Sequence, residues 1–564
     1  MQKFLSKAII CFMIIFLGMA TTSHFIVNLL FTIHNGFKGS FLDNEKFVNP
    51  LLYIVGIVIF VFLFYLFFRM TKKVATQRLR IISIFFAIFV SLFFCMVYYA
   101  PMQTSDVMVS SLGFFTRKTY LAQHPNNLAL SFIYKLIYYA FGFGSFQIMY
   151  FINIFTCAII VYILPKITRI ITKSEKAERI NILLLFLFYP LFALTTFLYN
   201  DFLGISSSLL ALYFAFVFIE NKKMKNIIFS AIFMSVAFFI RQNMVFFMIG
   251  IIFLLFYNLL QEKKQVLKNI TIIILLPIVV LSFSFITSTI IYNAFDLPKD
   301  GAFPKTYWIA MSLQNRDSTK GHDYRAPGAY TRKINNIIKE KSPNMNKLSP
   351  KDKSDLYNSY SVEEIKTRLS EYAHNPLLAL KTFAQKLTYT YGDSVFEANS
   401  RLQYNLNLEK EYIENYQTAY ENFSGLTDQK DKLYFNEDST KSAAFANRVG
   451  TVIIKGKIAN FIRYIVTKPF ALLIYLGALL YIILYRKKLN KYELTICLIF
   501  LGAFTFHQFL WETRTRYILP AFILLIPLAC YITSNAISKL DKCVSQIYNK
   551  CNWDKINKGE RHGT

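Results

Sequence analysis

The chain has 564 residues, of which 55% are hydrophobic, and its mean hydropathy of +0.38 is too high for an ordinary soluble protein. The formal net charge of +29 would suit a nucleic-acid-binding protein, but residues 293–467, the long polar stretch, hold 25 Lys and Arg against 20 Asp and Glu, a net of only +5. The remaining +24 lies at the ends of apolar runs, where Lys and Arg mark cytoplasmic loops and attract anionic lipid. We therefore exclude nucleic acid as a partner and expect the lipid bilayer instead.

Apolar runs of about 18 residues or more recur along the chain and predict transmembrane helices, because a helix satisfies its own backbone hydrogen bonds in hydrocarbon. The predicted fold class is an α-helical polytopic membrane protein with about twelve transmembrane helices, an exterior juxtamembrane helix and a large exterior insert. The expected spans are residues 8–33, 50–68, 81–99, 146–164, 180–197, 202–219, 226–240, 244–260, 270–292, 470–485, 494–510 and 517–533.

The first apolar run follows a short basic segment, residues 1–7, as it would in a signal peptide. The run is longer than a usual signal core and shows no clear small-residue cleavage site. We expect an uncleaved first span whose amino end lies in the cytoplasm.

The run at residues 128–143 decides the topology of everything that follows. If it and residues 146–164 both crossed the membrane, the basic loop at 166–179 and each later loop would violate the positive-inside rule. The segment is short, carries Lys135 and several tyrosines, and has Gly142 near its end, which is typical of an interfacial helix. We predict that it lies along the outer surface.

This topology divides the chain into four parts. We predict an N-terminal membrane module (1–292, about nine spans, with a catalytic first exterior loop at 100–145), an extracytoplasmic loop domain (293–467), a C-terminal membrane module (468–535, about three spans) and a basic cytoplasmic tail (536–564). Both termini are then cytoplasmic.

None of the seven cysteines lies in 293–467 and no pair has a metal or redox spacing, so we expect neither disulfides nor zinc. Within 293–467, residues 361–379 have a helical pattern.

With this topology, the ionisable groups at the outer ends of the spans meet on one face. Such groups at the edge of hydrocarbon are costly and often functional. A carboxylate with cationic partners beside a bilayer suits a reaction on a lipid-linked anion, because the cations hold a phosphate while the carboxylate takes a proton. The residues are Asp106, His124, Lys135, Asp201, Arg241, Glu512, Arg514 and Arg516.

Asp106 is our candidate general base, which accepts a proton from an acceptor hydroxyl or amine; the alternative is a loop aspartate that caps the next helix. Asp201 either orients a substrate or caps the span that starts beside it. Arg241, Arg514 and Arg516 either clamp the phosphate or snorkel to the interface.

The other candidates have structural alternatives too. Lys135 either meets the phosphate or snorkels, and His124 either positions the donor or is incidental. Glu512 either takes part in catalysis or pairs with a neighbouring arginine. No cofactor is predicted; a lone Asp106 is a poor cation site, and metal dependence stays open.

The order and sidedness of these short motifs resemble the GT-C superfamily of membrane glycosyltransferases, of the protein O-mannosyltransferase and lipid A aminoarabinose transferase type (glycosyltransferase family 39-like). The resemblance covers the membrane portion, about two thirds of the chain. Where protein O-mannosyltransferases commonly show an Asp-Glu pair, this chain has Asp106-Val107. The matching pieces are Ser105-Asp106, Gln123-His124-Pro125-Asn126-Asn127-Leu128, residues 136–142, Tyr199-Asn200-Asp201 and Glu512-Thr513-Arg514-Thr515-Arg516-Tyr517-Ile518-Leu519-Pro520.

The resemblance implies an enzyme that transfers a sugar from a polyprenyl-phosphate-linked donor to an extracytoplasmic cell-envelope acceptor, which is a glycan, a lipid or a protein. It also adds Asn127 and Tyr517, within the matching motifs, to the substrate-binding candidates. The richness in Lys, Asn, Ile and Phe indicates an AT-rich genome and a bacterial plasma membrane, with the active site outside.

Two other functions remain open. A cell-surface polysaccharide polymerase or ligase also has about twelve spans and a large exterior loop, but is expected to keep essential Arg and His in that loop. A membrane transporter tends to show paired repeats and helices broken at midplane depth, neither of which the sequence shows convincingly. The chain has no Walker loop or dinucleotide fingerprint, which argues against ATP-driven transport and against nucleotide-sugar use.

Overall fold

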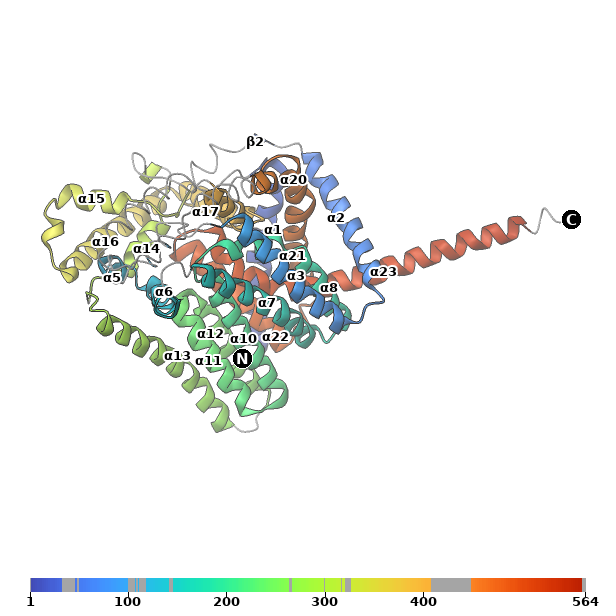
Figure 1. Ribbon diagram of the computed structural model, residues 1–564, viewed down its shortest axis with the longest axis horizontal. Coiled ribbons are helices and arrows are strands. Elements are labelled where there is room, and N and C mark those ends of the chain that lie inside the picture. Colours follow the sequence, from blue (N-terminus) through green and yellow to red (C-terminus); the bar gives the residue numbers. More distant parts are fainter. Residues whose placement is uncertain are drawn as a thin grey trace.

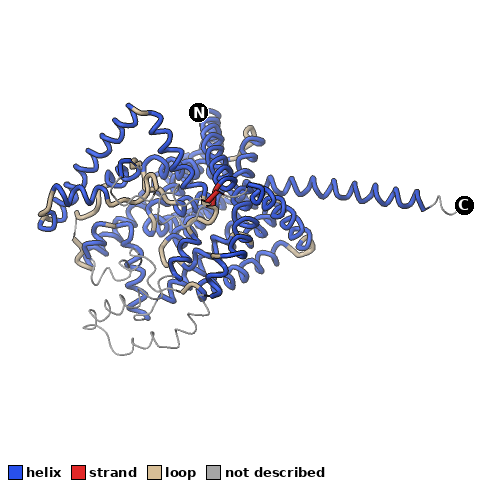
Figure 2. Tube along the Cα trace, turned by 90° about the horizontal axis from the view of Figure 1, so that it is seen from above, coloured by secondary structure: helices blue, strands red, loops and turns tan. Residues whose placement is uncertain are grey.

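The structure is a computed structural model that describes residues 2–32, 46–47, 50–99, 107, 110, 118–141, 146–262, 266–298, 300–315, 317–319, 326–406 and 448–559. Within these residues the chain is helical apart from one short antiparallel pair, β1 (Phe31–Thr32) and β2 (Lys46–Phe47), in which Phe31 faces Phe47. Figure 1 shows the helices gathered into one body, and Figure 2 shows the carboxyl-terminal helix projecting away from it.

Ten helices of the described chain are long and apolar enough to cross a membrane, so the protein is a multi-pass membrane protein. Each lies where the sequence predicts a span, although several extend beyond the predicted limits. They are α1 (Gln2–Leu30), α2 (Pro50–Thr71), α3 (Thr76–Val97), α7 (Phe146–Thr172), α10 (Asp201–Asn221), α12 (Val245–Gln261), α13 (Val266–Ala294), α21 (Lys468–Tyr485), α22 (Lys491–Thr505) and α23 (Leu519–Gly559).

The expected number of twelve spans is not confirmed. The span predicted at 180–197 is two helices, α8 (Glu175–Phe186) and a second piece from Tyr189, with a bend of 55° between them. Pro190 stands at the start of α9 (Tyr189–Ala193), and a proline lacks the amide donor and disfavours helical backbone in the residue before it. The span predicted at 226–240 is α11 (Met224–Ile240), which has 17 residues and is not counted among the ten. By comparison, α12 and α22 reach 20 residues each together with the helical turns that adjoin them (Gln242–Gln261 and Lys491–Leu510).

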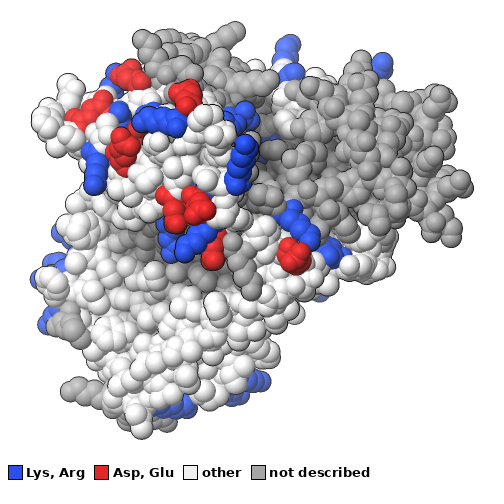
Figure 3. Space-filling view, turned by 90° about the vertical axis from the view of Figure 1, so that its left-hand side faces the viewer, with Lys and Arg blue, Asp and Glu red and all other residues white. Residues whose placement is uncertain are grey.

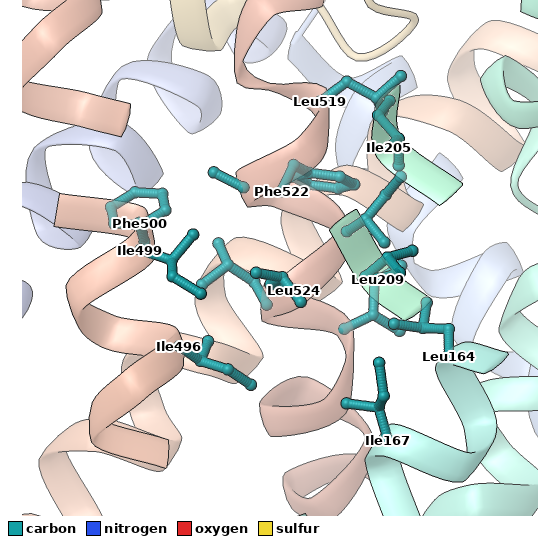
Figure 4. Close-up of a cluster of buried hydrophobic side chains, with 14 of the residues drawn as sticks. Leu164, Ile167, Ile205, Leu209, Ile496, Ile499, Phe500, Leu519, Phe522 and Leu524 are labelled. Atoms are coloured by element: carbon teal, nitrogen blue, oxygen red, sulfur yellow. The ribbon is translucent and has the colours of Figure 1, made fainter. Parts of the chain in front are cut away.

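The helices sort into an inner and an outer set. In the apolar stretch of α23, 83% of the residues are buried, whereas in that of α13 only 22% are. Leu267, Phe285 and Ile290 of α13 are exposed. Figure 4 shows the interior, where aliphatic and aromatic side chains of α7, α10, α22 and α23 interlock. Figure 3 shows a broad band without charged side chains below a cap where both signs gather. Apolar side chains exposed on this scale require a lipid solvent.

The polar stretch forms a helical cap at one end of the bundle (Figure 1). Its helices are α14 (Lys305–Ser312), α15 (Lys333–Lys341), α16 (Pro350–His374) and α17 (Pro376–Gly392). Ser349 and Asn375 cap α16 and α17 by accepting from backbone amides, and a proline follows each cap. The helical pattern at 361–379 is therefore interrupted at Asn375, because the residue before a proline avoids helical backbone.

Helix α17 connects this cap to the first span. The ring of His24 in α1 donates to the carbonyl oxygen of Tyr391 at 2.9 Å, and the amide of Asn28 donates to the carbonyl oxygen of Gly392 at 2.9 Å. Both side chains are buried. These bonds fix the end of α17, and with it the loop that follows, against the bundle.

Shorter elements complete the end of the bundle that carries the polar cap. Between α3 and α7 lie α5 (Lys118–Gln123), the 3₁₀ turn η1 (Pro125–Asn127) and α6 (Leu128–Phe141). Helix α6 has 14 residues, a length of about 21 Å, which is less than the ~30 Å hydrocarbon core. Helix α20 (Gly456–Phe461) runs into the π-helical turn η7 (Ile462–Thr467) before α21, and a second π-helical turn, η8 (Phe506–Leu510), ends α22.

Candidate active site

The predicted site residues fall into three groups. Asp106, the candidate base, lies outside the described residues. Six candidates come from three turns at one end of the spans and form one cluster: Asp201 after the α9–α10 turn, Arg241 between α11 and α12, and Glu512, Arg514, Arg516 and Tyr517 between α22 and α23. The other three candidates belong to the α5–α6 segment. Asn127 lies beside this cluster, and His124 and Lys135 lie farther from it.

Asp201 is the link between two of the turns. Its carboxylate forms an ion pair with Arg241, and its Oδ2 accepts from Nη1 of Arg516 at 3.0 Å. Asn200, not Asp201, occupies the N-cap position of α10. The side chains of the two arginines are only 7% and 5% exposed, so their charges are compensated by Asp201 rather than by water.

A second carboxylate, Glu397, extends the network on the other side. Its Oε2 lies 3.3 Å from Nη2 of Arg401, 3.8 Å from Nη1 of Arg514 and 3.9 Å from Nε of Arg516. Arg514 also donates from Nε to Oε1 of Glu512 at 2.8 Å, which is the structural pairing that the sequence left open. Burial lowers the pKa of Arg514, but Glu512 and Glu397 raise it more, so its pKa is well above the ordinary value. Four arginines and three carboxylates thus meet in one buried cluster.

Aromatic rings surround the arginines. The guanidinium carbon of Arg241 lies 5.0 Å from the ring centroid of Tyr199 and 5.5 Å from that of Tyr517. The guanidinium carbons of Arg516 and Arg401 lie 4.8 Å and 4.3 Å from the ring centroid of Phe197. Cation–π contacts of this kind hold guanidinium groups without neutralising their charge.

Asn127 joins the α5–α6 segment to the cluster. Its Oδ1 accepts from the hydroxyl of Tyr199 at 2.5 Å, and its Nδ2 donates to the hydroxyl of Tyr120 at 2.9 Å. The side chain is buried. The turn that carries Asp201 is therefore bound to the α5–α6 segment.

The remaining two candidates do not meet the arginines. The ring of His124 packs 4.5 Å from that of Tyr120 and 6.2 Å from that of Trp308, which stacks on Trp511 at 5.5 Å. Lys135 lies over the ring of Phe295, with Nζ 3.5 Å from the centroid. Burial, and then the neighbouring Lys118, lower the pKa of Lys135.

Glu397 and Arg401 were missed by the sequence reasoning. Phe396 and Glu397 have φ angles of +51° and +64°, a left-handed backbone that L-residues adopt rarely and at a cost of about 1–3 kcal/mol each. Asp393 stabilises this turn by accepting from the amides of Val395 (2.9 Å) and Glu397 (2.7 Å). The signal in the sequence was the Glu397–Arg401 spacing of four, which favours an ion pair on one helical turn.

The polar cap is also tied to the turn that carries the arginines. The amide of Thr513 donates to the carbonyl oxygen of Gly328 at 2.8 Å. Beside it, Nζ of the buried Lys386 donates to the carbonyl oxygen (3.0 Å) and the hydroxyl (2.8 Å) of Ser312. Among the described residues, no three His, Cys, Asp or Glu side chains gather as a metal ion would require.

The fold and this cluster define a class: a polytopic helical membrane protein with a buried network of arginines and carboxylates at one end of its spans. Residues 123–287 match the family described as dolichyl-phosphate-mannose-protein mannosyltransferase. The resemblance to GT-C membrane glycosyltransferases is therefore confirmed, and the protein is a membrane glycosyltransferase of that type. The match includes Asp201 and Arg241 and begins after Asp106. Comparison with curated proteins finds no match.

Proposed function

We propose that this protein transfers a sugar from a polyprenyl-phosphate-linked donor to an extracytoplasmic acceptor of the cell envelope. The observation that carries the proposal is the family match over the segment that supplies Asp201 and Arg241 to the charged cluster. It also favours sugar transfer over the polymerase, ligase and transporter alternatives. The positive-inside rule supports cytoplasmic termini and an exterior site.

The reaction exchanges one bond for another at the anomeric carbon of the sugar. The acceptor oxygen or nitrogen forms a bond to that carbon, and the bond from the carbon to the phosphate oxygen breaks. The polyprenyl phosphate leaves with the bonding electrons, and the acceptor proton passes to the carboxylate of Asp106. A general base typically contributes about 10²–10⁴-fold to such a step.

The clustered side chains have positioning roles in this scheme. Arg241, Arg514 and Arg516 provide a positive field at the leaving phosphate, and Asp201 and Glu512 fix their orientation through the ion pairs described above. Asn127 and Tyr517 line the same region. His124 and Lys135 help to bind the substrate from the first exterior segment.

The test is an Asp106→Asn substitution in a host-strain deletion, followed by mass spectrometry of the envelope glycans. The expected result is loss of one sugar modification that the wild-type protein restores. Asp317→Asn, at an exposed aspartate of the polar stretch, is the matched control and should restore it. An Asp106→Asn strain that adds every sugar found in wild type would refute the assignment of the base.

The sidedness has a separate test. A cysteine at position 170, near the carboxyl end of α7, should be shielded from a membrane-impermeant thiol reagent added outside. A cysteine at position 136 in α6, where Leu136 is exposed, should react with the same reagent. Labelling at position 170 from outside would overturn the topology.

A further inference from the structure

A cavity of about 310 Å³ lies where α2 ends and α3 and α8 begin, beside α23. Helix α8 packs on both α3 and α23, and Figure 1 shows α2 close to them. Asp541 lies about 33 Å along α23 from Leu519, and the hydrocarbon core is ~30 Å thick. The cavity is therefore about one membrane thickness away from the turn that carries Glu512 and Arg516. It is lined by Phe68, Lys72, Thr76, Glu175, Lys176, Arg179 and Asp541.

The charges around this cavity leave it positive. Three cations and two carboxylates line it, so its formal charge is +1. In the part of the chain that the structure describes, none of these five side chains forms an ion pair within 4.0 Å. At longer range Asp541 attracts Lys176, and Glu175 attracts Arg179. The third cation, the exposed Lys72, repels Lys176, so the cavity stays positive after its own attractions are counted.

Neutral groups orient two of the cations. Nζ of Lys176 donates to the hydroxyl of Ser538 at 2.6 Å and lies 5.3 Å from the ring centroid of Phe68. Nη1 of Arg179 donates to the carbonyl oxygen of Val74 at 2.7 Å, whereas Nε and Nη2 are buried and have no hydrogen-bond partner among the described residues. Unmet buried donors on a charged group are costly, and an anion in the adjacent cavity offsets that cost.

The two carboxylates keep room for a hydrogen-bond donor. Glu175 accepts from the hydroxyl of Thr76, and Asp541 accepts from that of Tyr65, both at 2.9 Å. A carboxylate has about four acceptor positions, so each can also accept from a hydroxyl group of a ligand. Thr76 and Glu175 are the first residues of α3 and α8, and the partial positive charge of a helix N-terminus adds to the attraction for an anion.

Apolar surface adjoins the cavity. Met70 stands shortly before Lys72 on α2 and is 81% exposed, and Leu540, directly before Asp541 on α23, is exposed as well. A soluble ion has no use for such surface, whereas the acyl chains of a lipid cover it. Ligand pockets commonly have volumes of about 300–1,000 Å³, so this cavity has room for a lipid headgroup.

We propose that this cavity binds the headgroup of an anionic glycerophospholipid whose headgroup carries hydroxyl groups. Lys72, Lys176 and Arg179 attract the phosphate, and a hydroxyl group donates to Glu175 or Asp541. One negative charge balances the +1 of the cavity, whereas a zwitterionic headgroup leaves it uncompensated. Phosphatidylglycerol has both the single negative charge and the hydroxyl donors. The proposal does not depend on sugar transfer.

The test is binding of defined ligands to the purified full-length protein, measured by native mass spectrometry. The probes are phosphatidylglycerol, phosphatidylethanolamine with the same acyl chains, and glycerol 1-phosphate. Wild type should bind phosphatidylglycerol at least tenfold more tightly than either of the other probes. The double variant Lys72→Gln/Lys176→Gln should lose at least tenfold in affinity for phosphatidylglycerol, and Lys72→Arg/Lys176→Arg should keep most of it. Unfolding curves of each variant verify that it folds.

Lys73→Gln/Lys223→Gln is the matched control, because both lysines are exposed, lie outside the cavity and remove the same two charges. It should bind the three probes as wild type does. An equal loss in this control, or unchanged binding by Lys72→Gln/Lys176→Gln, overturns the proposal. Phosphatidylethanolamine bound as tightly as phosphatidylglycerol refutes the selection by charge, and glycerol 1-phosphate bound as tightly refutes the lipid as the ligand.

Discussion

Replacing Lys386 by Met should make the protein more stable at neutral pH, although it removes a charged group with two hydrogen bonds. Lys386 is buried on α17 between Ser312 and Gly328. Burial lowers its pKa from 10.5 to about 7. The folded state therefore holds its proton less tightly than the unfolded state does.

The sign of the pH dependence follows from linkage. Between about pH 7 and pH 10.5 the unfolded chain binds more protons at this site than the folded chain, so the wild-type protein gains stability as pH rises through that window. The fall in pKa from 10.5 to about 7 lowers the free energy of unfolding of the wild-type protein by about 5 kcal/mol, because each pKa unit is worth ~1.4 kcal/mol. This destabilisation is fully present below pH 7. In the variant, the loss of the two hydrogen bonds offsets about 2 kcal/mol of the stability gained by removing the buried amine.

Lys386→Met should thus exceed wild type by about 3 kcal/mol near pH 6.5 and match it near pH 9. Denaturant unfolding of both proteins in mixed micelles, repeated from pH 6 to pH 10, measures this difference. Lys381→Met, at an exposed lysine of the same helix, is the control and should differ from wild type by the same small amount at each pH. A difference between Lys386→Met and wild type that does not change with pH would refute the reasoning.

Other substitutions test the packing of the site. Asp201→Asn leaves the buried Arg241 without its carboxylate and leaves Arg516 with only Glu397 at 3.9 Å, so it should lower the free energy of unfolding by about 3–5 kcal/mol. In the same assay, Lys173→Met breaks a pair whose side chains are 62% and 42% exposed and should change that free energy by less than about 1 kcal/mol. Gly328→Ala should destabilise by more than about 1 kcal/mol, because φ is +69° and a Cβ would meet three atoms at 2.7–2.9 Å; an unchanged unfolding midpoint would contradict this. Gly56→Ala should push α2 away from Tyr464, which an engineered-disulfide or spin-label distance between the two helices would report.

Hydropathy and charge alone placed the spans well, since lipid tolerates little besides apolar side chains and basic loops stay inside. The errors arose where local backbone chemistry intervened. Pro190 divides one predicted span into two bent helices, and Asn375-Pro376 divides one predicted polar helix. Both prolines are visible in the sequence. The continuous apolar run in the first segment and the helical pattern in the second nevertheless favoured the prediction of one unbroken helix in each.

The site shows the same division between local and distant information. The meeting of Asp201, Arg241 and Arg516 could be predicted, because each is a charged residue at the end of an apolar run, whereas their roles stay predictions. The contacts of Glu397 with Arg514 and Arg516 could not be predicted, since Glu397 lies in the long polar stretch and only its pairing with Arg401 is local in the sequence. The role of Asp106 stays a prediction.

The bonds that α1 makes to α17 also bear on how the chain is assembled. His24 and Asn28 leave the ribosome early, but their partners Tyr391, Gly392 and Lys468 follow between 364 and 444 residues later. At roughly 5–20 residues per second, the last partner is synthesised about 20–90 s after the first span. During that interval the side chains of His24 and Asn28 lack these carbonyl hydrogen-bond acceptors in the bilayer. Helix α1, which is synthesised before these partners, is therefore fixed in place only after they follow, and factors that shelter polar residues during insertion should matter for this span.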